Sequence, residues 1–168
     1  MGAIGTIAAT VVTAIIALTG YLRDVRLRSA AARNAILLAA SIASKGLYQV
    51  SRFDGFLDTT GSVTAVRYGV KSFLATPAWL EIKEAIAELR PQDLPDHPTA
   101  EAYIQVRAIL RAIDQLLSSI GNLSATSDGA ISWPNIQNYV EPLERELSIL
   151  KALASRFERP FTPRWLRI

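Results

Sequence analysis

His97 is the only histidine of the chain, and Asp93 and Asp96 lie within four residues of it. An imidazole beside two carboxylates has the side-chain types that bind a divalent cation or act as a general base. A zinc site needs three or four ligands, and the chain holds no cysteine to complete the set. Because these residues stand in a proline-rich segment, we interpret Asp96 and His97 as turn or helix-capping residues.

Other catalytic or nucleotide-binding patterns are missing from the sequence. Neither the phosphate-binding pattern GxxxxGK[ST] nor the dinucleotide-binding pattern GxGxxG occurs. Because His97 is the only histidine, a serine–histidine–aspartate triad would have to include it, and no spacing in the sequence supports such a triad. We therefore predict that the chain is not an enzyme and that it takes no cofactor, no metal and no small-molecule substrate.

Two charged segments are candidates for binding a partner. Glu81, Glu84 and Glu88 share one face of a predicted helix, which favours a solvated face over a docking site for a basic partner. The last segment, residues 161–168, mixes basic and aromatic side chains that suit a protein groove or an anionic membrane surface. A tail folded back on its own domain is an equal alternative. The residues predicted to make the tail's contact are Phe161, Arg164, Trp165 and Arg167.

The net charge of +3 is unevenly distributed along the chain. Basic residues gather near residues 23–33 and at the C-terminus, whereas most of the charged residues within 81–128 are acidic. A nucleic-acid binder usually has a concentrated basic face with aromatic residues among it, so we predict no nucleic-acid partner. Arginine beside an apolar segment instead indicates an anionic membrane surface.

That apolar segment is the N-terminal run, residues 2–22, which holds 21 uncharged residues. About 20 apolar residues are enough for a helix to cross a bilayer. The run lacks the basic start of a cleavable signal peptide, so we predict an uncleaved anchor over residues 1–23. The positive-inside rule then places the N-terminus outside and the rest in the cytoplasm, in a single-pass protein of the inner membrane. A helix buried in a protein bundle is the alternative.

Two groups of residues would serve this anchor. Small residues recur every four positions along the run and predict a face for helix association: Gly5, Ala9, Thr13 and Ala17. Ala and Gly are common in membrane helices, so composition without contact is an equal explanation. Directly after the run come basic residues expected to lie at the membrane surface: Arg23, Arg26 and Arg28.

The rest of the chain has the apolar spacing of helices. The first helix is expected to continue to about residue 50, with a break near residues 28–32 as an alternative, and the segment 53–62 reads as a loop. Residues 63–75 suit a helix better than a strand, and Thr76-Pro77 is a helix start signal. Prolines make residues 91–98 a linker.

The C-terminal part continues this pattern. Apolar residues spaced by three and four predict a helix that ends at Gly121, followed by a polar loop over residues 121–132. A short helical piece is expected at 133–140, and Pro142 is expected to start the last helix, which Pro160 ends. No strand pairs or repeats are evident.

These features predict an all-α protein: a single N-terminal transmembrane helix, then an antiparallel bundle of about four to five helices over residues 24–160, then the tail. The function they favour is a membrane-anchored interaction or assembly module. Its partners would be the lipid bilayer and either another protein or copies of itself. The alternatives are an oligomeric, holin-like or pore-forming membrane effector, and a soluble helical subunit of a larger particle.

Overall fold

The computed structural model describes residues 2–59, 63–122 and 136–157, and these form five α-helices and one 3₁₀ turn, with no strand among them. The all-α prediction is confirmed for this part of the chain. Within the helices, the side chains of residues 2–12, 14, 57–59 and 63 are not described. The helix bounds are α1 Gly2–Thr59, α2 Val63–Leu74, α3 Pro77–Glu88, α4 His97–Gly121 and α5 Gln137–Arg156, with the 3₁₀ turn η1 at Pro91–Asp93.

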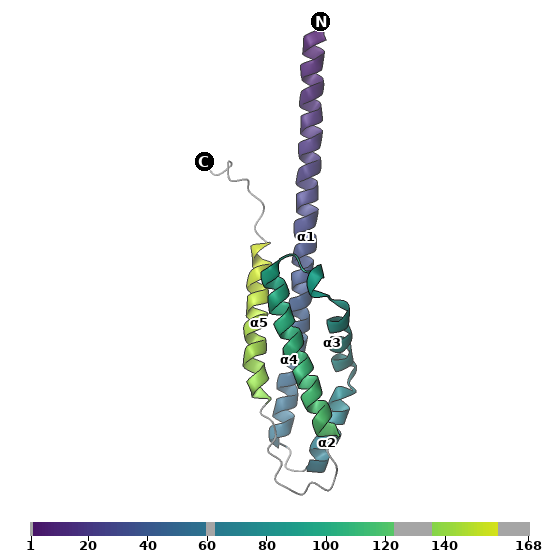
Figure 1. Cartoon of the computed structure of the whole chain (residues 1–168), viewed down its shortest axis with the longest axis vertical. Helices are drawn as coiled ribbons and strands as arrows, with labels where there is room; N and C mark the ends of the chain where they lie inside the picture. Colours follow the sequence, from purple (N-terminus) through teal and green to yellow (C-terminus); the bar gives the residue numbers. More distant parts are fainter. Residues whose placement is uncertain (1, 60–62, 123–135, 158–168) are drawn as a thin grey trace.

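The helices run alternately along one axis (Figure 1). The C-terminal half of α1 lies against α5 on one side and α3 on the other, while α4 packs on α5 and α2. Helices α2 and α3 follow each other in the same direction and together fill one position of the bundle. The N-terminal half of α1 extends past the end of the bundle, and no other described element lies beside it.

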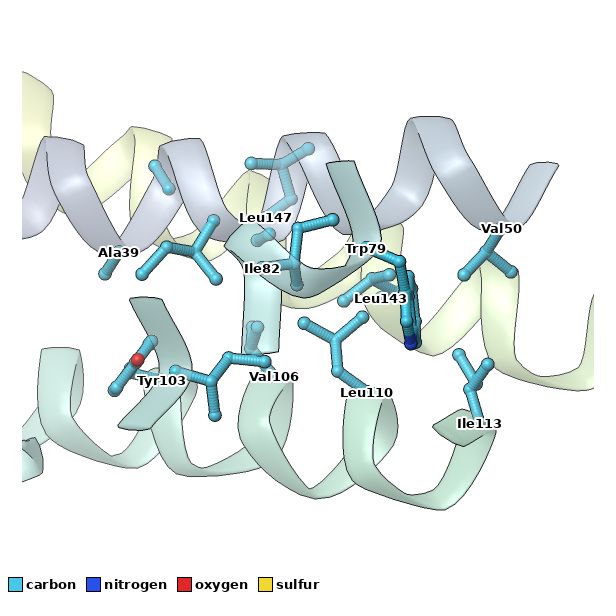
Figure 2. Packing of buried hydrophobic residues seen from close by; sticks show 14 of the residues in the cluster. Ala39, Val50, Trp79, Ile82, Tyr103, Val106, Leu110, Ile113, Leu143 and Leu147 are labelled. Atoms are coloured by element: carbon cyan, nitrogen blue, oxygen red, sulfur yellow. The ribbon is translucent and has the colours of Figure 1, made fainter. Parts of the chain in front are cut away.

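One hydrophobic core holds the bundle together (Figure 2). All of the long helices contribute to it, with Trp79 and Ile82 from α3 facing Leu110 from α4. The largest fully buried side chain is Trp79, which is 1% exposed. Since burial of a large apolar side chain contributes about 1.5–3 kcal/mol, this core is the main source of the bundle's stability.

Capping residues set the starts of α3 and α4 as the sequence predicts. The Thr76 hydroxyl accepts a hydrogen bond from the Trp79 backbone N–H at 3.3 Å, and Pro77 occupies the first helical position. At α4, the Asp96 carboxylate accepts from the Thr99 N–H at 2.9 Å. The predicted end of α4 at Gly121 is also confirmed.

Two predicted boundaries are wrong. Helix α1 does not end at about residue 50 but continues to Thr59, and the break near residues 28–32, considered as an alternative, does not occur. Its extension is held by the Phe53 ring, which is 5% exposed and lies 4.6 Å from the Phe73 ring of α2. Aromatic burial there outweighs the local turn signal of Asp54-Gly55.

The last helix also differs from the prediction. α5 begins at Gln137 and has Pro142 inside it, so Pro142 does not start the helix. Residues on both sides of the proline are anchored in the core, since Ile136 is 1% and Leu143 0% exposed. Their burial compensates for the backbone hydrogen bond that proline cannot donate. Residues 133–135 of the expected short piece lie outside the described residues.

The predicted membrane anchor is tested only in part. Over the side chains that the structure describes, no helix has a stretch that is both long and apolar enough to cross a membrane. Most of the uncharged run, residues 2–12 and 14, lies outside the described side chains.

Candidate interaction surfaces

The N-terminal half of α1 carries exposed apolar side chains. Among the described ones, Ile15, Ile16 and Leu18 are 55–65% exposed, and Tyr21 and Leu27 are 62% and 61% exposed. The first buried side chain among the described residues of α1 is Ile36, and before it only Ala35 packs against the core. Exposed apolar residues gathered on one element indicate a surface that another protein or a membrane covers.

The basic residues predicted for the membrane surface follow directly on this helix. Arg23, Arg26 and Arg28 are all exposed, and Arg28 forms an ion pair with Asp24 one turn earlier, at 2.7 Å. A pair at this spacing stabilises an exposed helix by only about 0.3–0.5 kcal/mol. Arg23 and Arg26 are exposed on the part of α1 that extends beyond the bundle, where they can contact anionic groups.

The predicted small-residue face is only partly described. The side chains of Gly5 and Ala9 lie outside the described residues, while Thr13 and Ala17 are both exposed. The described residues end at Phe157. The predicted contact residues of the tail therefore also lie outside them: Phe161, Arg164, Trp165 and Arg167. The structure leaves both predictions as they stand.

The residues around His97 have structural roles. Asp96 caps α4, as above, and the Asp93 carboxylate accepts from the Arg90 backbone N–H at 3.2 Å. His97 is exposed, and its Nδ1 lies 3.8 Å from a carboxylate oxygen of Glu101. In the part of the chain that is described, no three His, Cys, Asp or Glu residues are grouped to hold a metal ion. The interpretation of Asp96 as a capping residue is confirmed.

The acidic face of α3 is solvated. Glu81, Glu84 and Glu88 are exposed, and Glu81 lies 3.6 Å from Lys45 of α1. Exposed pairs of this kind contribute about 0–1 kcal/mol. The row thus supports the packing of α3 on α1 more than it marks a site.

A polar network between α3 and α4 was not anticipated from the sequence. The Trp79 indole Nε1–H donates to one oxygen of Asp114 at 2.9 Å, and the Lys83 ammonium donates to the other at 3.0 Å. Asp114 is only 23% exposed, so its charge is stabilised by both donors. No local pattern reveals this network, because Trp79 and Asp114 are 35 residues apart.

The network lies on a groove of about 410 Å³ between the two helices. Its floor is apolar, with Ile82, Ile86 and Leu110, and Arg111 stands at its rim. A second groove of about 290 Å³ lies beside the ring of Phe53 between α1 and α2. At the edge of the first groove, the hydrogen bond to Asp114 fixes the orientation of the Trp79 ring.

Comparison with known proteins gives no further assignment. No family model, no curated protein and no solved structure matches this chain. Its function must therefore be argued from these surfaces alone.

Proposed function

We propose that this protein is a membrane-anchored helical assembly module, in which α1 holds the bundle at a fixed distance from the bilayer. The observation that carries the proposal is the continuity of α1: one helix of 58 residues bears the apolar run at its start and core residues of the bundle at its end. No flexible linker separates the two parts.

The dimensions of α1 suit this role. At 1.5 Å per residue, the uncharged run over residues 2–22 is about 30 Å long, which equals the thickness of the hydrocarbon core. Residues 23–35, between this run and the first buried residue, add about 20 Å. A helix of this length would place Arg23, Arg26 and Arg28 among the headgroups and hold the bundle just beyond them.

Charge gives the direction of the proposed anchor. The arginines follow the apolar run directly, with Asp24 as the only acidic residue among them. Because basic residues beside a span stay on the cytoplasmic side, the bundle would lie in the cytoplasm of a bacterial cell. The exposed apolar residues Ile15, Ile16 and Leu18 would then face lipid rather than water.

The test is extraction of membranes with alkaline carbonate after expression of the full chain. We expect the chain to stay in the pellet, and a double variant, Ile15→Arg with Ile16→Arg, to move into the supernatant, since each arginine costs about 2.5–3.5 kcal/mol in the middle of a span. Ile104→Arg is the matched control, because Ile104 is 47% exposed on α4, within the bundle. It should remain in the pellet.

Release of the unmodified chain as a monodisperse species would refute the anchor and favour a helical subunit of a larger particle. Leakage of small solutes from cells that express the chain would instead favour the pore-forming alternative.

Orientation can be read from a single cysteine at exposed Ser148, since the chain has no native cysteine. In intact spheroplasts, an impermeant maleimide should leave that cysteine unlabelled.

A further inference from the structure

One side of α1 differs from its other sides in the stretch just outside the bundle. Four half-buried residues recur there at intervals of three and four: Leu22, Val25, Ser29 and Ala32. The other residues from Arg23 to Ala31 are exposed. Residues at these intervals share one side of a helix, and none of the four is charged. We name these four residues the upper stripe.

The upper stripe continues the side of α1 that packs against α5. Ile36 is the next residue at this spacing, and Ala40 and Ala43 follow it in the core. Asp54 stands about five full turns after Ile36, on the same side, and accepts a hydrogen bond from Gln137 of α5 at 3.2 Å. Helix α5 runs antiparallel to α1 (Figure 1). The stripe is therefore an extension of an established interface beyond the end of α5.

The register of this interface places the end of α5 beside the upper stripe. Both helices rise 1.5 Å per residue, so about 30 Å along each of them from the Gln137–Asp54 pair brings Phe157 level with Asn34. The residues after Phe157, 158–168, cover about 17 Å as a helix and up to about 36 Å when extended. Either length exceeds the distance of about 14 Å from Asn34 to Val25.

The loops that lie outside the described residues cannot reach the upper stripe. Residues 60–62 and 123–135 join α1 to α2 and α4 to α5 at the opposite end of the bundle. A loop as long as 123–135, held at both ends, extends at most about 23 Å from its anchors. Helix α1 rises about 35 Å between Ile36 and Thr59 alone. Residues 158–168 are the segment of this chain that is long enough and begins in the right place.

The tail carries a short repeat of α3. Residues 76–82 read TPAWLEI and residues 162–168 read TPRWLRI. The shared residues are the helix start signal Thr-Pro and the apolar residues Trp, Leu and Ile. The expectation that the chain holds no repeat is therefore wrong for this motif.

In α3 the motif has a definite inner and outer side. Trp79 and Ile82 are buried in the core at 1% and 2% exposed, whereas Leu80 is 46% exposed. Helix α3 packs against α1 and runs antiparallel to it, which is also the direction of a chain that continues α5 along α1. The structure thus contains one example of this motif packed beside α1.

We propose that residues 158–168 continue the α1–α5 interface and cover the upper stripe of their own chain. Trp165 and Ile168 occupy the positions of Trp79 and Ile82 in the motif, so they face the stripe. Of the alternatives for the tail, this is the one in which it packs on its own chain. The contact lies within one chain and does not depend on the membrane anchor.

Burial of apolar side chains, and not charge, drives this contact. Basic residues stand on both sides of the stripe and in the segment that covers it: Arg26, Arg28, Arg159, Arg164 and Arg167. Because like charges repel, the removal of Trp165 and Ile168 from water must supply the stabilisation. The covered stripe would brace α1 between the bundle and the apolar run.

Two cysteine pairs test the contact, because the chain has no cysteine of its own. In the full chain, Thr162→Cys with Ser29→Cys should form a disulfide within one chain on mild oxidation, both in membranes and in mild detergent. Thr162→Cys with Leu27→Cys is the matched control, since exposed Leu27 lies two residues from Ser29 on the opposite side of α1. The control pair should oxidise about tenfold more slowly.

Substitutions in the tail show which of its sides makes the contact. With the cysteines at positions 162 and 29 in place, Trp165→Ser should slow disulfide formation about tenfold, because it removes the largest buried apolar group. Leu166→Ser is the matched control. Leu166 corresponds to exposed Leu80, so this change should alter the rate by less than about twofold. Both variants should keep the helical circular dichroism of the bundle.

The proposal fails if both cysteine pairs oxidise equally fast, if Leu166→Ser slows the reaction as much as Trp165→Ser, or if the disulfide joins two chains. A disulfide that forms in detergent but not in membranes would place the tail on the lipid surface and also overturn it. Carbonate extraction of the same samples separates this result from that of the anchor. A released chain whose Ser29→Cys pair still oxidises would retain the contact and refute the anchor, whereas a pelleted chain whose pair does not oxidise would retain the anchor and refute the contact.

Discussion

Helix α1 consists of two regions with the same backbone and different surroundings. From Ile36 to Phe53 its inner side is part of the core, whereas before Ile36 no described side chain is buried (Figure 1). Ile15 is 55% exposed and Ile36 is fully buried, although both belong to apolar spacings of the same kind. Apolar periodicity therefore shows that a helix side must be covered, but not what covers it.

The comparison also explains what each region depends on. The inner region is stabilised by tertiary contacts with α3, α4 and α5, as most protein helices are. In the outer region, Ala35 is the last residue before Ile36 and is the one described apolar side chain that packs against the core, so the stability of the preceding turns depends mainly on helix propensity and on what surrounds them. Substitutions matched between the two regions test this difference.

The largest difference is expected for Ile36→Ala compared with Ile15→Ala. Removing three methyl or methylene groups from a fully buried isoleucine should lower the free energy of unfolding of the bundle by about 2–5 kcal/mol. The same change at exposed Ile15 leaves no cavity and should have an effect within about 0.5 kcal/mol. Chemical denaturation of the full chain in mild detergent measures both, and equal losses would contradict the division of α1.

Two glycines give a smaller contrast in the same helix. A Cβ at Gly46 would lie 2.7 Å from a methyl carbon of Leu110, so Gly46→Ala must displace α4 or the leucine side chain. We expect a loss of about 1–3 kcal/mol, less the gain in helix propensity. No heavy atom lies within 4 Å of a Cβ at Gly20, so Gly20→Ala should not lower the unfolding midpoint. A rise of the same size in both variants would show that backbone entropy, not packing, governs these positions.

The sequence predicted those parts of the fold that local chemistry decides. Thr76-Pro77 starts α3 and Gly121 ends α4 because capping and backbone constraints act over a few residues. The extension of α1 past Asp54-Gly55 was missed, since it depends on the contact of Phe53 with Phe73, which lies on another helix. Burial beyond the immediate neighbours likewise overrides the start signal of Pro142.

The features of the candidate surfaces also differ in whether the sequence alone reveals them. The apolar run and the arginines that follow it, Arg23, Arg26 and Arg28, were evident as runs of residues. The hydrogen bond between Trp79 and Asp114 joins residues 35 positions apart and leaves no trace in local spacing.

The third comparison concerns two tyrosines, Tyr103 and Tyr21. Replacing either by phenylalanine should change the stability least at pH 7, and the effect of replacing Tyr103 should depend strongly on pH. Tyr103 is fully buried, and its hydroxyl has no hydrogen-bond partner among the described residues. Tyr21, in the outer region of α1, is 62% exposed. Burial raises the pKa of Tyr103 above the usual value of 10.0, against the opposing effect of the positive charges of Arg107 and Arg111.

The sign of the effect follows from this shift. Because the pKa of Tyr103 is higher in the folded state, the unfolded chain loses this proton first as the pH rises. The stability tied to neutral Tyr103 is fully present below about pH 10, and it is lost as the pH rises through the folded-state pKa. Tyr103→Phe should remove this alkaline loss. At pH 7 it should change stability little, because no hydrogen bond is removed.

Unfolding midpoints of the parent chain, Tyr103→Phe and Tyr21→Phe, measured at pH 7 and above pH 10, decide the matter. Lysines also titrate at high pH, so the informative quantity is the difference between each variant and its parent at each pH. That difference should grow with pH for Tyr103→Phe and stay near zero for Tyr21→Phe. If the difference stayed near zero for Tyr103→Phe as well, the hydroxyl of Tyr103 would be ionising in water, and the surroundings of Tyr103 would be less closely packed than its burial indicates.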